Sequence, residues 1–201
     1  MDQEGKNDLE SVRRVQAGET EAFEPLVRRH EKKIFNLLYR WLGDYDEAAE
    51  AAQEVFLSAY RAIHRFRGES SFSTWLYRIA VNHAKNRWKS RRGAERFMAP
   101  ISDAELNGDG GPVVNFPDPA PDPAQTVERR ELEKQVQRGL NTLHSDEALV
   151  ILLHDLQDFS YEEISGLLDI PLGTVKSRLH RARLALKAKL APYRNSIKAR
   201  E

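Results

Sequence analysis

The chain has 201 residues, of which 40% are hydrophobic and 31% charged, and its formal net charge is zero. A chain of this length forms one or two small domains. It has no cysteine, which excludes disulfides and thiolate metal sites and fits a reducing compartment. Its first ten residues lack the apolar core of a signal peptide, and its longest apolar run, residues 148–153, is too short to cross a bilayer. We therefore expect a soluble, cytoplasmic protein.

Charge is segregated along the chain although the total is zero. Residues 61–96 hold ten Lys and Arg against two acidic residues, and residues 173–201 hold nine against one, whereas residues 1–60 and 97–172 are acidic. Each basic block can attract phosphates locally. The pattern predicts two separate nucleic-acid contacts in one chain.

The N-terminal part has the periodicity of amphipathic helices. Apolar residues from Phe23 to Trp41 predict a helix that Gly43 ends. Acidic residues begin the next helix, which continues to about Ile63, and the helix dipole favours them there. A third helix is expected over residues 72–92. No segment alternates with period two, so we expect no strand.

Aromatic and basic side chains are interleaved over residues 66–92. Proteins that bind single strands combine rings that stack on unpaired bases with cations that hold the backbone. Phe72 and Trp75 lie on the apolar stripe of the helix, so packing in the core is the favoured role for them. Tyr77 and Trp88 lie off that stripe, and both core packing and base stacking stay open for them.

The polar residues of the same segment fit contacts with base edges. Asn82 and Asn86 share a helical face with basic residues, and amide groups on a basic face are suited to base-edge contacts. Ser70 and Ser71, which precede the helix, fit either helix capping or base contact.

Residues 97–125 are rich in proline and glycine and include six of the nine prolines. About thirty residues without a packed element are unusual inside a compact domain. We therefore expect a tether between two domains. Binding of this segment in a groove of a partner is an alternative that the residues leave open.

The C-terminal part predicts helices that end in a helix-turn-helix. One helix is indicated by a single apolar, core-facing stripe of Leu132, Val136, Leu140 and Leu143. A second helix is expected over residues 145–156. Ser160 and Glu163 have the spacing of a capping box, and Pro171 ends the helix that they begin.

A basic helix follows from Leu172 to about Lys187. Its apolar residues recur at steps of three and four and form one core-facing stripe. The residues outside that stripe are suited to the major groove of duplex DNA; they include Lys176, Ser177, Arg178, His180, Arg181 and Arg183.

Three motifs in this order resemble the extracytoplasmic-function (ECF) sigma factors, the minimal two-domain group of the sigma-70 family of bacterial transcription initiation factors. A lone helix-turn-helix would be weak support, but independent motifs on both sides of a linker are specific. The matching stretches are Glu47, Glu50 and Gln53 continuing to Phe56 and Tyr60, then FRGESSFSTWLYRIAVN at 66–82, and SYEEISGLLDIPLGTVKSRLHRAR at 160–183.

The resemblance implies an all-α fold of two small helical domains joined by a flexible linker: sigma region 2 at 8–96, the linker at 97–125 and sigma region 4 at 126–190. It implies a factor that binds core RNA polymerase through the clamp of the largest subunit and the flap. Such a factor directs promoter-specific initiation by reading a duplex −35 element and a melted −10 element. We expect no catalysis, cofactor, metal or small-molecule substrate.

The resemblance also places three groups of functional residues. Polymerase binding falls on Asp46, Glu47, Glu50, Gln53, Glu54, Phe56 and Leu57. Contacts with the −10 element fall on Arg67, Gly68, Ser70, Ser71, Phe72, Tyr77, Arg78, Asn82, Lys85 and Asn86. Contacts with the −35 element fall on Thr174, Lys176, Ser177, Arg178, His180, Arg181 and Arg183.

Factors of this kind commonly act in extracytoplasmic stress responses and are held inactive by an anti-sigma factor. The resemblance therefore implies such a partner here. A membrane-bound anti-sigma factor would hold the protein at the inner membrane face.

Two other classes of protein fit these residues less well. A stand-alone helix-turn-helix regulator that binds an operator would leave residues 66–82 unexplained. An enzyme such as a nuclease is disfavoured, because the six histidines lack metal-ligand spacing and neither a P-loop nor a nucleophile elbow occurs.

Overall fold

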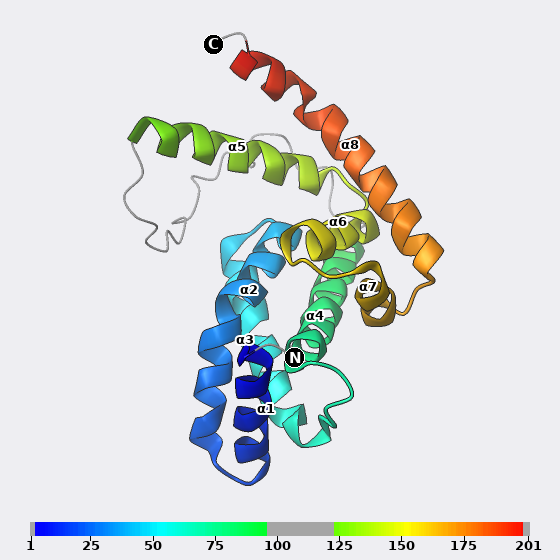
Figure 1. Cartoon of the computed structure of the whole chain (residues 1–201). Helices are drawn as coiled ribbons and strands as arrows, with labels where there is room; N and C mark the ends of the chain where they lie inside the picture. Colours follow the sequence, from blue (N-terminus) through cyan, green and yellow to red (C-terminus); the bar gives the residue numbers. More distant parts are fainter. Residues whose placement is uncertain (1–2, 96–122, 199–201) are drawn as a thin grey trace.

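The computed structural model describes residues 3–95 and 123–198, and every regular element in those ranges is a helix (Figure 1). This confirms the expected all-α class. The elements are α1 (Gln3–Gln16), η1 (Thr20–Phe23), α2 (Glu24–Leu42), α3 (Tyr45–Ala62), η2 (Ile63–Arg65), α4 (Phe72–Glu95), α5 (Pro123–Asn141), α6 (Ser145–Ile151), the π-helical turn η4 (Leu152–Leu156), α7 (Tyr161–Leu168) and α8 (Leu172–Lys198).

The N-terminal bundle consists of α1 to α4, and local signals set the ends of its helices. Gly43 ends α2 as predicted; its φ of 80° lies in the left-handed region that glycine adopts without strain. Asp44 caps α3 by accepting a hydrogen bond from the Glu47 backbone N–H at 2.8 Å. Helices α2, α3 and α4 pack on one another, and α1 contacts both α2 and α4.

The C-terminal unit packs α5, α6 and α7 against α8. The predicted capping box is confirmed: Ser160 Oγ accepts from the Glu163 backbone N–H, and Glu163 accepts from the Ser160 backbone N–H at 2.8 Å. Helix α5 begins at Pro123, so the last three residues of the expected linker are helical, since proline suits a first helical position. Residues 96–122 lie outside the described ranges.

One detail of the predicted stripe on α5 is wrong. Leu132 was expected to face the core, but its side chain is 43% exposed. Leu140, on the same predicted stripe, is buried, because the C-terminal half of α5 is the part close to α8 and the end of α2. Periodicity therefore predicts which face of α5 is apolar, but it does not predict how much of that face is buried by other helices.

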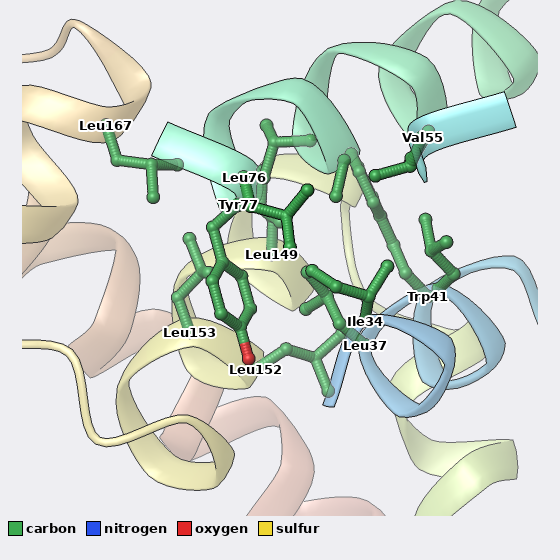
Figure 2. Close-up of a cluster of buried hydrophobic side chains, with 14 of the residues drawn as sticks. Ile34, Leu37, Trp41, Val55, Leu76, Tyr77, Leu149, Leu152, Leu153 and Leu167 are labelled. Carbon is green, nitrogen blue, oxygen red and sulfur yellow. The ribbon is translucent and has the colours of Figure 1, made fainter. Parts of the chain in front are cut away.

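The buried apolar side chains of both units form one continuous cluster. Leu149, Leu152 and Leu153 of α6 and η4 pack beside Ile34 of α2 and Tyr77 of α4 (Figure 2), and all five are at most 2% exposed. Full burial of a leucine is worth about 1.5–3 kcal/mol. The two units are therefore held against each other by an apolar contact that also contributes to the core of each.

Polar contacts surround this apolar contact. The Tyr77 hydroxyl donates to Gln157 Oε1, and its ring meets Phe159 edge-on at 4.8 Å between centroids. Arg78 Nη2 donates to the Gly166 carbonyl at 3.0 Å. Where α5 meets the end of α2, Gln137 Nε2 donates to the Arg40 carbonyl at 2.9 Å.

Tyr77 is therefore buried, and its placement off the buried face of α4 was wrong. Within the N-terminal bundle alone the position would be peripheral. The segment from η4 to α7, some eighty residues later in the chain, covers it. Burial raises the pKa of the Tyr77 hydroxyl well above its usual value, because the phenolate would lose its hydration there.

Within residues 3–95 and 123–198, no helix has both the length and the apolar character that crossing a membrane would require.

The raised pKa of Tyr77 predicts that the two units separate in alkali. Neutral Tyr77 stabilises the packed arrangement fully below the ordinary tyrosine pKa of about 10, and this stabilisation is lost as the pH rises past that value toward the higher pKa of the packed state. The separation between labels on α3 and α8, measured by fluorescence energy transfer, should therefore increase above about pH 10.

The matched variants are Tyr77→Phe and Tyr39→Phe. Tyr77→Phe should remove this pH dependence, at a cost of about 0.5–1.5 kcal/mol at neutral pH from the lost hydrogen bond. Tyr39→Phe, at a ring stacked on Phe35 of α2, should leave it unchanged. Identical alkaline transitions in all three proteins would show that Tyr77 does not hold the units together.

Candidate nucleic-acid and protein interfaces

The helix-turn-helix is built from α7 and α8 with a short, hydrogen-bonded turn. Asp169 ends α7 in the left-handed region, with a φ of 53°. Ser165 Oγ donates to the Ile170 carbonyl at 2.6 Å, and the Ile170 N–H donates to the Ser165 carbonyl at 3.1 Å. These bonds fix the angle at which α8 leaves the turn, and Val175 and Leu179 of α8 are buried as predicted.

The outer face of α8 is polar and accessible. Lys176, Ser177 and His180 are exposed, and Thr174 is half-buried at the start of the helix. Within the described residues, Lys176 and His180 form no ion pair. In the predicted −35 surface, these side chains could therefore contact the major groove of DNA without breaking any ion pair within the protein.

The three arginines of this face are paired within the C-terminal unit. Arg178 lies 2.8 Å from Asp146, Arg181 lies 2.7 Å from Glu147, and Arg183 pairs with Asp155. The hydrogen bonds that Arg183 donates to the Asp155 carboxylate raise the pKa of Arg183. Surface pairs of this kind contribute about 0–1 kcal/mol each, so phosphate groups of DNA can replace the carboxylates at little cost.

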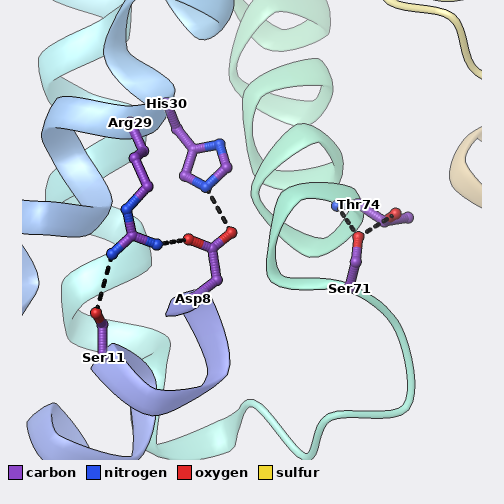
Figure 3. Close-up of polar contacts among 6 residues, drawn as sticks. All are labelled: Asp8, Ser11, Arg29, His30, Ser71 and Thr74. Carbon is purple, nitrogen blue, oxygen red and sulfur yellow. Dashed lines mark hydrogen bonds and ion pairs between the residues drawn. The ribbon is translucent and has the colours of Figure 1, made fainter. Parts of the chain in front are cut away.

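An exposed loop joins η2 to α4 at residues 67–71, inside the predicted −10 surface. Its flanks, Phe66 and Phe72, are 7% and 1% exposed, which confirms core packing for Phe72. Gly68 has a φ of 76°, where a side chain would introduce strain. Ser71 caps α4, since its Oγ accepts from the Thr74 N–H at 3.0 Å (Figure 3).

The rest of the predicted −10 surface is divided by the packing of the two units. Asn82 and Asn86 are exposed on α4, and Lys85 is half-buried. Tyr77 and Arg78 are engaged by the C-terminal unit, as described above. The side chain of Trp88 lies outside the described residues.

Helix α3 carries the predicted polymerase surface. The exposed members of that set are Asp46, Glu50, Gln53, Glu54 and Leu57, whereas Glu47 and Phe56 are half-buried. The apolar residues here matter because Leu57 is 54% exposed and Tyr60 38%. Acidic residues around exposed apolar side chains are typical of a protein-binding face.

Tyr60 ends the motif of α3 that begins at Glu47. Its partial exposure adds it to this face, next to Phe23, whose ring it meets edge-on at 5.2 Å. Its spacing of three from Leu57 is the signal that could have placed the two on one face.

Two basic residues of α4 contact the acidic face of α3. Arg87 lies 3.0 Å from Glu54 and 3.4 Å from Glu50, and His83 lies 3.5 Å from Glu54. The hydrogen bond from Arg87 is the main cause that lowers the pKa of Glu54. The predicted polymerase face and the predicted −10 helix are thus joined by ion pairs.

Sequence reasoning missed a set of polar contacts made by α1. Gln16 donates to the carbonyls of Ile63 and Phe66, and buried Asp8 binds Arg29 and His30 (Figure 3). No spacing signal reveals partners that lie more than twenty residues apart. In the part of the chain that the structure describes, no group of three or more histidine, aspartate or glutamate residues could hold a metal ion.

Comparisons with known proteins identify the family. Residues 26–94 match Sigma-70 region 2, and residues 133–186 match Sigma-70, region 4. The RNA polymerase sigma-H factor of Pseudomonas aeruginosa is 38% identical over 188 residues, covering 93% of this chain and 95% of that protein. The ECF RNA polymerase sigma-E factor of Escherichia coli is 40% identical over 183 residues, covering 90% and 93%.

Solved structures share the fold. The sigma factor RpoE, solved with the anti-sigma factor NepR from Bartonella quintana, aligns with a TM-score of 0.63 at 21% identity, over 84% of this chain and 96% of that one. CnrH, solved with the cytosolic domain of CnrY, aligns with a TM-score of 0.65 at 23% identity, over 92% and 98%.

Membership of this family excludes both alternatives, the operator-binding regulator and the enzyme. Sigma factors are not enzymes, and they act on promoters through RNA polymerase. The chain belongs to the ECF sigma factors of the sigma-70 family, and it directs transcription initiation.

Proposed function

We propose that three surfaces of this sigma factor each bind a different partner during transcription initiation. The exposed face of α3 binds the clamp of the polymerase largest subunit, loop 67–71 with α4 captures the melted −10 element, and α8 reads the −35 duplex. In this proposal residues 8–96 and 126–190 form the two working units and residues 97–125 connect them. The observation that carries it is the exposure of three chemically distinct faces on one small molecule.

The α8 surface supports reading of duplex DNA. A recognition helix contacts base edges with residues of its N-terminal turns, and Lys176, Ser177 and His180 are exposed there. Arg181 and Arg183 lie further along the same helix and exchange their carboxylate partners for phosphates. Because phosphate contacts fix position while base contacts specify sequence, the first group sets promoter choice.

Loop 67–71 supports capture of an unpaired base. Turning a base out of the stack costs a few kcal/mol, which contacts formed only after melting must offset. The loop is exposed, contains polar Ser70 and cationic Arg67, and is anchored at both ends by buried phenylalanines. An exposed loop with fixed ends can offer such contacts without first becoming ordered.

The two promoter elements are too far apart for the packed arrangement. By the positions after which they are named, they lie roughly 25 base pairs apart, or about 85 Å at 3.4 Å per pair. Arg78 of α4 is 3.0 Å from the Gly166 carbonyl of α7. The two units therefore separate before both elements are bound, and separation also uncovers Tyr77 and releases Arg78 from its hydrogen bond to the Gly166 carbonyl.

We further propose regulation by an anti-sigma factor in an extracytoplasmic stress response. One protein of the same fold was solved with the anti-sigma factor NepR. A partner that stabilises the packed arrangement would keep Tyr77 buried and Arg78 hydrogen-bonded to the Gly166 carbonyl. The protein works beside RNA polymerase in the cytoplasm, and a membrane-bound anti-sigma factor would hold it at the inner membrane face.

Reconstituted transcription tests the proposal as a whole. Purified bacterial core polymerase, this protein and a library of promoter fragments from the source genome are combined, and new 5′ ends are sequenced. We expect new starts that share two motifs at fixed spacing and that need both proteins. Binding of promoter duplex by this chain alone, with no protein-dependent starts, would contradict the proposal.

The exposed residues of α8 should differ in how they affect affinity. On a promoter mapped as above, Lys176→Ala should weaken duplex binding by about 1–3 kcal/mol if the contact is to bases. Lys187→Ala, further along the same helix and also exposed, should weaken binding to all sequences and reduce the salt slope by about one. Fluorescence anisotropy with isolated −35 duplexes at several salt concentrations measures both effects.

The control is a scrambled duplex of the same length. Equal losses from Lys176→Ala on the promoter and the scrambled duplex would assign that lysine to the DNA backbone.

Charge reversal on α3 tests the polymerase surface. Glu50→Lys should weaken binding to core polymerase by about 1–2 kcal/mol, roughly tenfold, because a like charge replaces an attractive one at the interface. Glu24→Lys is the matched control: Glu24 is also an exposed helix residue that pairs with an arginine, Arg28 of α2, at 2.6 Å. Competition for core polymerase against a labelled sigma factor measures both, and equal affinities for the two variants would exclude Glu50 from the docking face.

A further inference from the structure

We propose that α1 is the positioning element for loop 67–71, holding the two ends of the loop through Gln16 and Asp8. The proposal rests on the assignment of this loop to the melted −10 element. Neither residue reaches the exposed part of the loop, so both are positioning residues. Helix α1 also precedes residues 26–94, the part of the chain that matches region 2 of the family.

Gln16 holds the entry to the loop. Its Nε2 donates to the carbonyl of Ile63 at 2.8 Å and to that of Phe66 at 3.0 Å. Phe66 is the last residue before the loop, and both bonds are partly buried. A single side chain thereby fixes the direction in which the backbone leaves η2.

Asp8 holds the exit from the loop through His30. The Asp8 carboxylate is 3% exposed; it accepts from His30 Nε2 at 2.7 Å and pairs with Arg29 (Figure 3). The His30 ring packs against Phe72 with 5.5 Å between centroids. Since Nδ1 of this buried ring has no hydrogen-bond partner among the described residues, the bond to Asp8 is what sets its orientation.

Aromatic contacts connect the two ends. The rings of Phe66 and Phe72 lie 6.0 Å apart, and Trp75 packs on both, at 5.3 and 5.7 Å. The five loop residues between them are exposed. A short loop with both ends fixed loses less conformational entropy when it binds a ligand, so the α1 contacts favour capture of a base by a pre-ordered loop.

The central test replaces Gln16 by methionine, which has similar length but no hydrogen-bond donor. Hydrogen exchange of the Phe66 amide, which donates to the Ile63 carbonyl at 3.0 Å, is measured in the full-length protein. Open-complex formation by the holoenzyme is measured by permanganate reactivity on a mapped promoter. Loss of both hydrogen bonds donated by Gln16 predicts a roughly tenfold or greater rise in the exchange of the Phe66 amide. Open-complex formation should fall by a similar factor, with polymerase affinity and −35 duplex binding unchanged.

Gln137→Met is the matched control. Gln137 also donates from Nε2 to a backbone carbonyl, that of Arg40, at 2.9 Å, but on the contact between α5 and α2. It should leave exchange at residues 66–72 unchanged. A general loss of stability would affect both variants and would be visible in their thermal midpoints.

Asp8 provides an independent test at the other end of the loop. Asp8→Ala should raise exchange around Phe72, whereas Asp8→Asn, which keeps an acceptor for His30, should restore part of the protection. Ser11→Ala removes only a hydrogen bond of 3.1 Å to Arg29 and should leave the loop unchanged.

The outcomes separate this inference from the function on which it rests. Unchanged exchange at residues 66–72 in both Gln16→Met and Asp8→Ala would overturn it. Raised exchange with normal open-complex formation would support positioning by α1 and overturn the assignment of the loop to the −10 element. Raised exchange with impaired open complexes, restored in part by Asp8→Asn, is the expected result.

Discussion

Burial of the leucines of α6 and η4 against α2 and α4 is the contact on which the arrangement of all three surfaces depends. Leu149, Leu152 and Leu153 are at most 1% exposed, and their neighbours come from a part of the chain more than seventy residues earlier (Figure 2). This contact brings α7 onto α4, so that Tyr77 is buried and Arg78 is hydrogen-bonded to the Gly166 carbonyl. It leaves loop 67–71, the α3 face and the outer face of α8 open.

The ion pairs of the protein, unlike its buried apolar contacts, can be exchanged for contacts with a partner. The segregated charges of the sequence are largely balanced inside each unit: arginines of α8 pair with acids of α6 and η4, and Arg87 of α4 pairs with acids of α3. Most of these pairs are solvent-accessible and individually weak. A phosphate backbone or a basic partner can therefore displace them without unfolding either unit, which lets a chain of zero net charge bind both DNA and protein.

Sequence signals predicted what neighbouring residues determine. The end of α2 at Gly43, the capping box of Ser160 and the buried stripe through Val175 and Leu179 all depend on residues within a few positions of one another. The motif order also identified the family. Such signals act through hydrogen bonds and steric limits of a single helix, so they hold whatever the helix packs against.

Features that depend on distant parts of the chain could not be predicted in this way. Tyr77 is buried only because residues about eighty positions later cover it, and Leu132 is exposed because the packed part of α5 begins further along. The contacts of Gln16 and Asp8 cross 47 and 22 residues of chain. Periodicity ranks the faces of a helix, but tertiary contacts decide which of its residues are covered and what their polar groups bind.

Chain length and interface strength together make the packed arrangement compatible with promoter binding. Residues 96–122 number 27, and a fully extended chain of that length reaches about 90 Å, close to the roughly 85 Å between the two promoter elements. The leucines at the centre give the contact between units its strength, but its polar rim is a few hydrogen bonds worth about 1 kcal/mol each. In the proposed complex, phosphate contacts with the promoter and protein contacts with polymerase would supply the free energy that opens an interface of this kind. The same interface keeps Tyr77, one of the residues proposed to bind the −10 element, buried in the free protein.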